Sequence, residues 1–160
     1  PKTTKMCIPR EKKIDNIKLA TTEAGLLPYY SGIYTTDLFG LNDKRFAKKS
    51  AGGLYIEKSS YDMIIMNTDR FGTNCNSLFT LLYESKKLKK LYKADRNNNW
   101  SAFTLQLASG IDTNKYSKYI FPYYSNYVHQ NKNTFIFVNK ASNKFQDLEN
   151  IILKKGIKCN

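Results

Sequence analysis

Short apolar segments separated by glycine-containing polar segments fill the first half of the chain. They predict strands at residues 17–22, 33–37 and 61–66, and the last of these, YDMIIM, is typical of a strand covered on both faces. A short helix is expected at 25–31, with Gly32 forming the turn into the second strand. Because a helical crossover returns the chain to the same edge of a sheet, we expect the three strands to be parallel and adjacent.

In the second half of the chain the hydrophobic pattern has a longer, helical period. Between residues 78 and 92 leucines recur every three or four positions opposite a lysine-rich face, which predicts an amphipathic helix. Later segments are predicted as a helix or strand at 100–111, strands at 119–124 and 134–139, and a helix at 143–154 that ends before Gly156. In the first half, a further helix is predicted through 45–47; it is capped by Asn42 or Asp43 and resumes at 54–58.

These elements predict one α/β domain at residues 14–160, preceded by a basic arm or linker at 1–13. The expected architecture has three layers, with a mainly parallel sheet in Rossmann-like order flanked by helices. No window approaches the roughly 18 consecutive apolar residues of a membrane helix, so this piece is expected to be soluble. Since it begins at Pro1 without a leader, we expect an excised part of a longer protein.

Polar side chains follow the ends of the three predicted parallel strands. In open α/β sheets ligands bind beyond the carboxyl ends of strands, so these side chains are expected to line one crevice. The candidate binding residues are Glu23, Tyr29, Tyr30, Asp37, Asn42, Asp43, Asn67 and Asp69. The two tyrosines offer flat faces on which a sugar ring or a base stacks. The alternative is that the acids only stabilise turns and helix amides and that the tyrosines only pack.

Lysine and arginine number 26 against 13 acids, a formal charge of +13. This excess favours acidic partners, namely nucleic acid, anionic lipid or a phosphorylated carrier. Only four of the basic residues are arginines, whereas base and phosphate recognition favours arginine, so lysine-rich solvated helix faces are the simpler interpretation. A free-standing domain that binds nucleic acid or another polyanion remains the alternative function.

No catalytic, metal or cofactor motif is found. The single histidine, His129, lies outside any nucleophile pattern, and phosphate-loop and dinucleotide fingerprints are missing, so we expect no catalytic residue, no metal and no cofactor. A small enzyme using Glu23 and Asp37 as acid and base is the third possibility. Cys7, Cys75 and Cys159 allow one disulfide at most; Cys7 with Cys159, a pair that includes Cys75, and three unpaired thiols all stay open.

The segment at 22–43, TEAGLLPYYSGIYTTDLFGLND, resembles the opening of the C-terminal domain of some bacterial multi-pass membrane glycosyltransferases of the glycosyltransferase-C superfamily. The matching positions are Glu23, Gly25, Tyr29, Tyr30, Ser31, Gly32, Asp37, Gly40, Leu41, Asn42 and Asp43. Downstream, Tyr61 and Asp62 stand where the family usually has Pro-Asp before an apolar strand. The resemblance covers about a third of the chain and is loose from Ser77 onward.

The resemblance implies a soluble domain on the periplasmic or extracytoplasmic face of a bacterial inner membrane, attached to upstream transmembrane helices of the same protein. Transfer from a lipid-linked sugar donor would then occur in the membrane portion, so no catalytic residue carries over to this chain. The implied partners are a glycan acceptor or a polyprenyl-phosphate-linked sugar, held at the crevice, with the lysines facing an anionic membrane surface or the carrier phosphate.

Overall fold

The chain folds around a six-stranded sheet with the strand order β2-β1-β3-β5-β4-β6. The computed structural model describes residues 14–22, 32–40, 56, 58, 60–68, 74–88, 100–125 and 130–160. Its strands are β1 (Leu19–Thr21), β2 (Thr35–Asp37), β3 (Met63–Thr68), β4 (Tyr116–Ser125), β5 (Gln130–Asn139) and β6 (Ile157–Cys159). Its helices are α4 (Cys75–Leu88), α5 (Trp100–Ala108) and α6 (Phe145–Ile152).

The three N-terminal strands are parallel, as predicted. Strand β1 pairs in parallel with β2 on one side and with β3 on the other. Gly32 has a φ of +64°, a left-handed conformation that suits glycine, and it leads into β2 as the predicted turn. The helix expected at 25–31 and the one at 45–47 lie outside the described residues, whereas Ile56 and Lys58 in the expected stretch 54–58 are helical.

The prediction of a mainly parallel, Rossmann-like sheet is wrong. Strand β5 runs antiparallel to β3 and to β4, and β6 runs antiparallel to β4, so the sheet is mixed. The physical reason is the short connection: only residues 126–129 separate β4 from β5, and a parallel crossover needs a dozen residues or more. The antiparallel strands are long, ten residues each in β4 and β5, and they therefore dominate the pairing.

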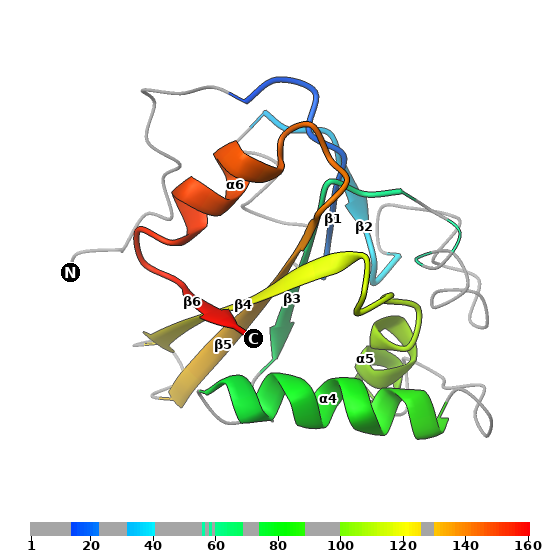
Figure 1. Cartoon of the computed structure of the whole chain (residues 1–160). Coiled ribbons are helices and arrows are strands. Elements are labelled where there is room, and N and C mark those ends of the chain that lie inside the picture. Colours follow the sequence, from blue (N-terminus) through cyan, green and yellow to red (C-terminus); the bar gives the residue numbers. More distant parts are fainter. Residues whose placement is uncertain are drawn as a thin grey trace.

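Helices pack on both faces of this mixed sheet (Figure 1), and each face has its own apolar cluster. Strand alternation sends Ile64 and Met66 to the face covered by α4 and α5, where they pack with Leu78 and Leu81 of α4. Met63 and Ile65 point the other way and pack beneath α6. Leu78, Leu81 and Leu82 of α4 are buried, as the leucine pattern predicted, whereas residues 89–92 of the predicted helix lie outside the described part of the chain.

A disulfide joins Cys75, the first residue of α4, to Cys159, the last residue of β6, with a Cα–Cα distance of 5.4 Å. Of the cysteine arrangements that the sequence left open, the one formed is therefore a pair that includes Cys75. Strand β6 has only three residues and pairs with β4, so this covalent bond supplements a short hydrogen-bonded edge. It also fixes the start of α4 against the sheet.

Asp62 connects several segments at the amino end of β3. Its carboxylate accepts hydrogen bonds from the Lys18 backbone N–H at 2.8 Å, the Ser142 hydroxyl at 2.6 Å and the Lys144 ammonium at 3.2 Å. Burial raises the pKa of Asp62, but these hydrogen bonds and the Lys144 charge together outweigh burial and hold that pKa below its usual value. The Asp at this position thus joins β1, β3 and the turn before α6.

Candidate functional site

Two of the eight predicted binding residues, Asp37 and Asn67, lie in the part of the chain that the structure describes. Both are at the carboxyl ends of parallel strands, Asp37 closing β2 and Asn67 one residue before the end of β3. The remaining candidates lie outside the described residues; they are Glu23, Tyr29, Tyr30, Asn42, Asp43 and Asp69. The part of the candidate site that the structure describes is therefore carried by the sheet itself.

Strand register places Asp37 and Asn67 on the same face of the sheet. Asp37 is paired with Thr21, and Thr21 is paired with Ile65, whose side chain packs in the cluster beneath α6. Paired residues share a face and alternate residues return to it, so Thr21, Asp37 and Asn67 all belong to the α6 face. Two strand spacings of about 4.8 Å each put β2 and β3 roughly 10 Å apart.

Two threonines complete this polar region. Thr134 of β5 is paired with Asn67, and its hydroxyl donates a hydrogen bond of 2.8 Å to the Asn67 side-chain oxygen. Thr21 lies between Asp37 and β3. We call Thr21, Asp37, Asn67 and Thr134 the edge cluster. Thr21 is fully buried, Thr134 is 2% exposed and Asp37 is 3% exposed.

The backbone around Asp37 turns sharply. The Asp37 carboxylate accepts a hydrogen bond of 3.0 Å from the Phe39 backbone N–H, and its carbonyl accepts one of 3.1 Å from Gly40, whose φ of +71° is left-handed. This is the Asx-type turn expected when an aspartate closes a strand. Asp37 therefore stabilises the turn that follows β2, as one of the two interpretations of this residue expected.

Asn67 connects β1, β3 and β5. Its backbone N–H donates a 2.9 Å hydrogen bond to the Thr22 hydroxyl, while its side-chain oxygen accepts from Thr134. The amide nitrogen of a side chain whose oxygen is fixed in this way has a defined direction as a donor. The edge cluster therefore combines carboxylate, amide and hydroxyl groups held by strand pairing.

These groups are of the kinds that hydrogen-bond a neutral, hydroxyl-rich ligand, and the carboxylate disfavours an anion. A carboxylate accepts hydrogen bonds from sugar hydroxyls, an amide both donates and accepts, and a threonine hydroxyl does either. Within the described ranges there is no group of three or more His, Cys, Asp or Glu side chains placed to hold a metal ion. The proposed acid and base pair involves Glu23, which lies outside those ranges.

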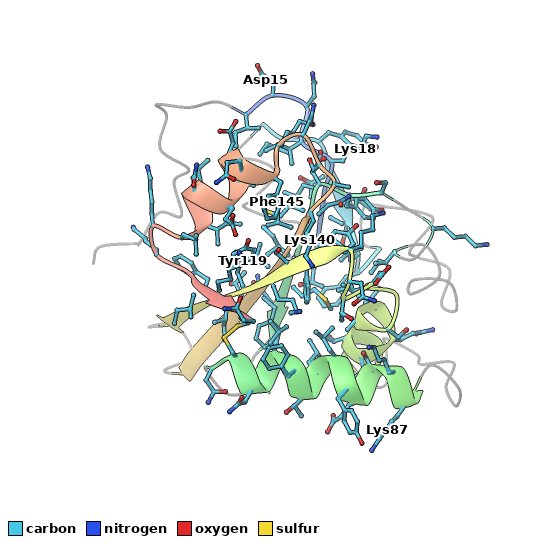
Figure 2. The ribbon with its side chains drawn as sticks, in the orientation of Figure 1. Asp15, Lys18, Lys87, Tyr119, Lys140 and Phe145 are labelled. Atoms are coloured by element: carbon cyan, nitrogen blue, oxygen red, sulfur yellow. A yellow bond between two sulfur atoms is a disulfide. The ribbon has the colours of Figure 1, made fainter. Side chains whose placement is uncertain are left out.

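A second group of titratable side chains, Tyr119, Glu149 and Lys158, lies beneath α6; Figure 2 labels Tyr119 on β4. The Tyr119 hydroxyl donates to Glu149 Oε1 at 2.6 Å, and Lys158 Nζ lies 2.6 Å from the same oxygen. Burial first, and then the bond to Glu149, raise the pKa of Tyr119, whereas Lys158 and then Tyr119 lower the pKa of Glu149 against the effect of burial. Tyr119 of β4 and Lys158 of β6 both bond the Glu149 carboxylate of α6, so the three side chains connect α6 to β4 and β6.

None of the helices in the described part of the chain is long and apolar enough to cross a membrane. Comparison with family models matches residues 10–147 to a domain of unknown function, DUF8728. No curated protein and no solved structure matches the chain.

Proposed function

Because this chain belongs to the DUF8728 family of domains of unknown function, its role has to be inferred from its own residues, and we propose that it is an extracytoplasmic domain that holds a glycan. In this proposal it is part of a membrane glycosyltransferase-like protein and binds the glycan acceptor or the lipid-linked sugar without catalysing transfer. The binding part rests on one observation, the edge cluster at the carboxyl ends of three parallel strands.

The disulfide supports the compartment. Disulfides persist in oxidising environments such as the periplasm and are rare in the cytosol of mesophilic organisms. In this domain one joins Cys75 to Cys159 across 84 residues and holds the last strand of the sheet. An extracytoplasmic location on the outer face of a bacterial inner membrane is consistent with that bond.

The glycan proposal is tested by titrating the 15N-labelled domain with neutral oligosaccharides at millimolar concentration and recording amide spectra. We expect shifts at Thr21, Asp37, Asn67 and Thr134. A Thr21→Val variant removes one buried hydroxyl from the interior of the edge cluster at nearly constant volume and is expected to weaken binding about fivefold or more, since loss of a buried hydrogen bond costs about 1–3 kcal/mol and loosens the groups around it. Unmoved edge-cluster amides would contradict the proposal.

A matched control separates binding from stability. Thr104 in α5 is 7% exposed and lies on a helix of the opposite face, so Thr104→Val makes the same chemical change in another buried environment. We expect Thr104→Val to leave glycan binding unchanged. If both valine variants weaken binding equally, the effect comes from general destabilisation and the edge cluster is not the site.

The membrane part of the proposal is tested on the gene. The reading frame upstream of Pro1 is expected to encode multiple apolar spans. A start codon directly before Pro1 would contradict this part and would favour the alternative, a free-standing domain that binds nucleic acid or another polyanion. The +13 charge favours that alternative, and it predicts an affinity for single-stranded oligonucleotides that falls steeply with salt.

A further inference from the structure

A groove of about 260 Å³ lies along α4, on the sheet face opposite the edge cluster. Strand alternation places Lys118 on this face, because Ile120, two residues further along β4, packs in the cluster under α4 and α5. The groove is lined by Phe79, Leu82, Tyr83 and Lys86 of α4, by Thr113 of the α5–β4 connection and by Lys118.

The lining combines aromatic faces with ammonium groups. Phe79, Tyr83 and Lys86 follow one another at steps of four and three residues, so they share one side of α4. Tyr83 is 62% exposed, although large aromatic side chains are usually covered. Lys118 Nζ lies 5.8 Å from the centre of the Phe79 ring, so an ammonium group is held next to the aromatic floor.

The charge of the groove has one sign. Two lysines are among its lining residues and no acid is. Lys87 Nζ lies 4.2 Å from the centre of the Tyr83 ring, and Figure 2 shows Lys87 on the outer side of α4, away from the sheet, so it adds positive charge near the exposed tyrosine. An exposed apolar surface surrounded by ammonium groups fits a ligand that is flat on one side and anionic on the other.

We propose that this groove binds a phosphorylated monosaccharide unit. The C–H face of the sugar ring packs on Tyr83, the phosphate lies near Lys86 and Lys118, and the Thr113 hydroxyl bonds a ring hydroxyl or a phosphate oxygen. The volume of about 260 Å³, just below the roughly 300–1,000 Å³ of pockets for drug-sized ligands, suits one sugar unit.

This site is separate from the edge cluster and uses different chemistry. The edge cluster offers neutral and acidic hydrogen-bonding groups on the α6 face, whereas the groove offers lysines and aromatic rings on the α4 face. The disulfide at Cys75 anchors the first residue of α4 to β6, so the helix that forms one wall of the groove is fixed against the sheet. Fixing the helix in this way limits the backbone ordering that binding requires.

The test compares glucose 1-phosphate, glucose and inorganic phosphate by calorimetry and by amide shifts of the 15N-labelled domain. We expect glucose 1-phosphate to bind at least about tenfold more tightly than either component, with shifts centred on Phe79, Tyr83 and Lys118. Vesicles of phosphatidylcholine containing phosphatidylinositol, with phosphatidylglycerol vesicles as the charge control, distinguish a lipid-linked polyol phosphate from a free one. Equal binding to inorganic phosphate, phosphatidylglycerol and glucose 1-phosphate would overturn the proposal, because it would indicate a nonspecific positive surface.

The variants change side chains that are exposed or half-buried, which keeps the risk to folding low. Lys86→Gln combined with Lys118→Gln is expected to weaken glucose 1-phosphate binding about tenfold or more, and Tyr83→Leu about threefold to tenfold. Lys154→Gln removes the same charge at an exposed position outside the groove and is expected to change nothing. Unchanged affinity in both groove variants would overturn the proposal. Thr21→Val is expected to leave glucose 1-phosphate binding intact, so failure at the groove and failure at the edge cluster are distinguishable.

Discussion

Replacing both Cys75 and Cys159 by alanine is expected to lower the free energy of unfolding by about 2–5 kcal/mol. The bond closes a loop of 84 residues, for which the chain-entropy relation gives about 4.5 kcal/mol at 25 °C. Cys159 is buried and ends a strand of three residues, so loss of the bond also loosens β6 along β4. This is the largest change in stability that we expect from altering any single interaction described above.

Urea unfolding of the oxidised domain, the reduced domain and the double alanine variant measures this effect. The oxidised domain should unfold at a clearly higher urea concentration than the other two, which should nearly coincide. Cys7→Ala is the control, since Cys7 lies outside the described residues and takes no part in the bond between Cys75 and Cys159. If Cys7→Ala destabilises the oxidised domain as strongly as Cys75→Ala, the pairing of Cys75 with Cys159 is wrong, and peptide mapping without reductant would identify the true pair.

The sequence predicted the parallel part of the sheet because its signals are local. A strand, a short connection with a glycine turn and a second strand define a crossover unit whose handedness and direction follow from chain geometry. The leucine period between residues 78 and 92 likewise reports burial of one helix face within a single segment. The β1–β2 pair and the buried helix face depend on neighbours that are close in the chain, whereas the pairing of β1 with β3 joins segments that are distant in the chain.

The antiparallel part was missed because its strands extend beyond their apolar residues. Strand β5 begins at Gln130 and includes polar residues up to Asn133, which have little intrinsic preference for strands and are held by pairing with β4. With those residues counted as loop, the separation between 119–124 and 134–139 concealed a hairpin. Strand β6 was missed entirely, since three residues with the sequence IKC carry no periodic pattern.

The candidate site was predicted in part. Asp37 is the last residue of β2 and Asn67 lies one residue before the end of β3, close to the strand ends that the sequence pattern indicates. Thr21 and Thr134 offered no such signal, because a threonine within a strand is an ordinary strand former whose role depends on the face to which it points. That face is set by the register of β1 against β3 and of β3 against β5, which is a tertiary property. The groove along α4 depends in the same way on where β4 passes the helix.

Replacing Lys158 by methionine is expected to lower the free energy of unfolding by about 1–2 kcal/mol at neutral pH. Glu149 is 9% exposed and its carboxylate oxygen is shared by Lys158 and Tyr119, so removing the ammonium leaves a buried charge with one donor fewer. Breaking a fully buried ion pair costs about 3–5 kcal/mol, but the Lys158 side chain is 41% exposed and solvent screens the interaction, which justifies the smaller figure.

The pH dependence gives this prediction a signature that a packing change lacks. In the native domain the pKa of Glu149 is lowered, so its contribution to stability is complete above the ordinary glutamate pKa and is lost as the pH falls through the lowered value. Without Lys158 the effect of burial, which raises that pKa, is opposed only by Tyr119. The stability difference between the native domain and Lys158→Met is therefore expected to be largest above about pH 5 and to shrink toward about pH 3.

Urea unfolding between about pH 3 and pH 7 tests this expectation, with Lys154→Met as the matched control at an exposed lysine. The control should differ from the native domain by no more than about 0.5 kcal/mol at every pH. A difference for Lys158→Met that is independent of pH would mean that the lysine acts through the contact of its ammonium with the Tyr119 ring, 6.0 Å from the ring centre, or through packing, and not through the charge of Glu149. The Glu149 carboxylate joins α6 to β4. If the Lys158 charge stabilises that carboxylate, the packing of α6 on the sheet weakens as acid protonates Glu149; a packing role of Lys158 predicts no such pH dependence.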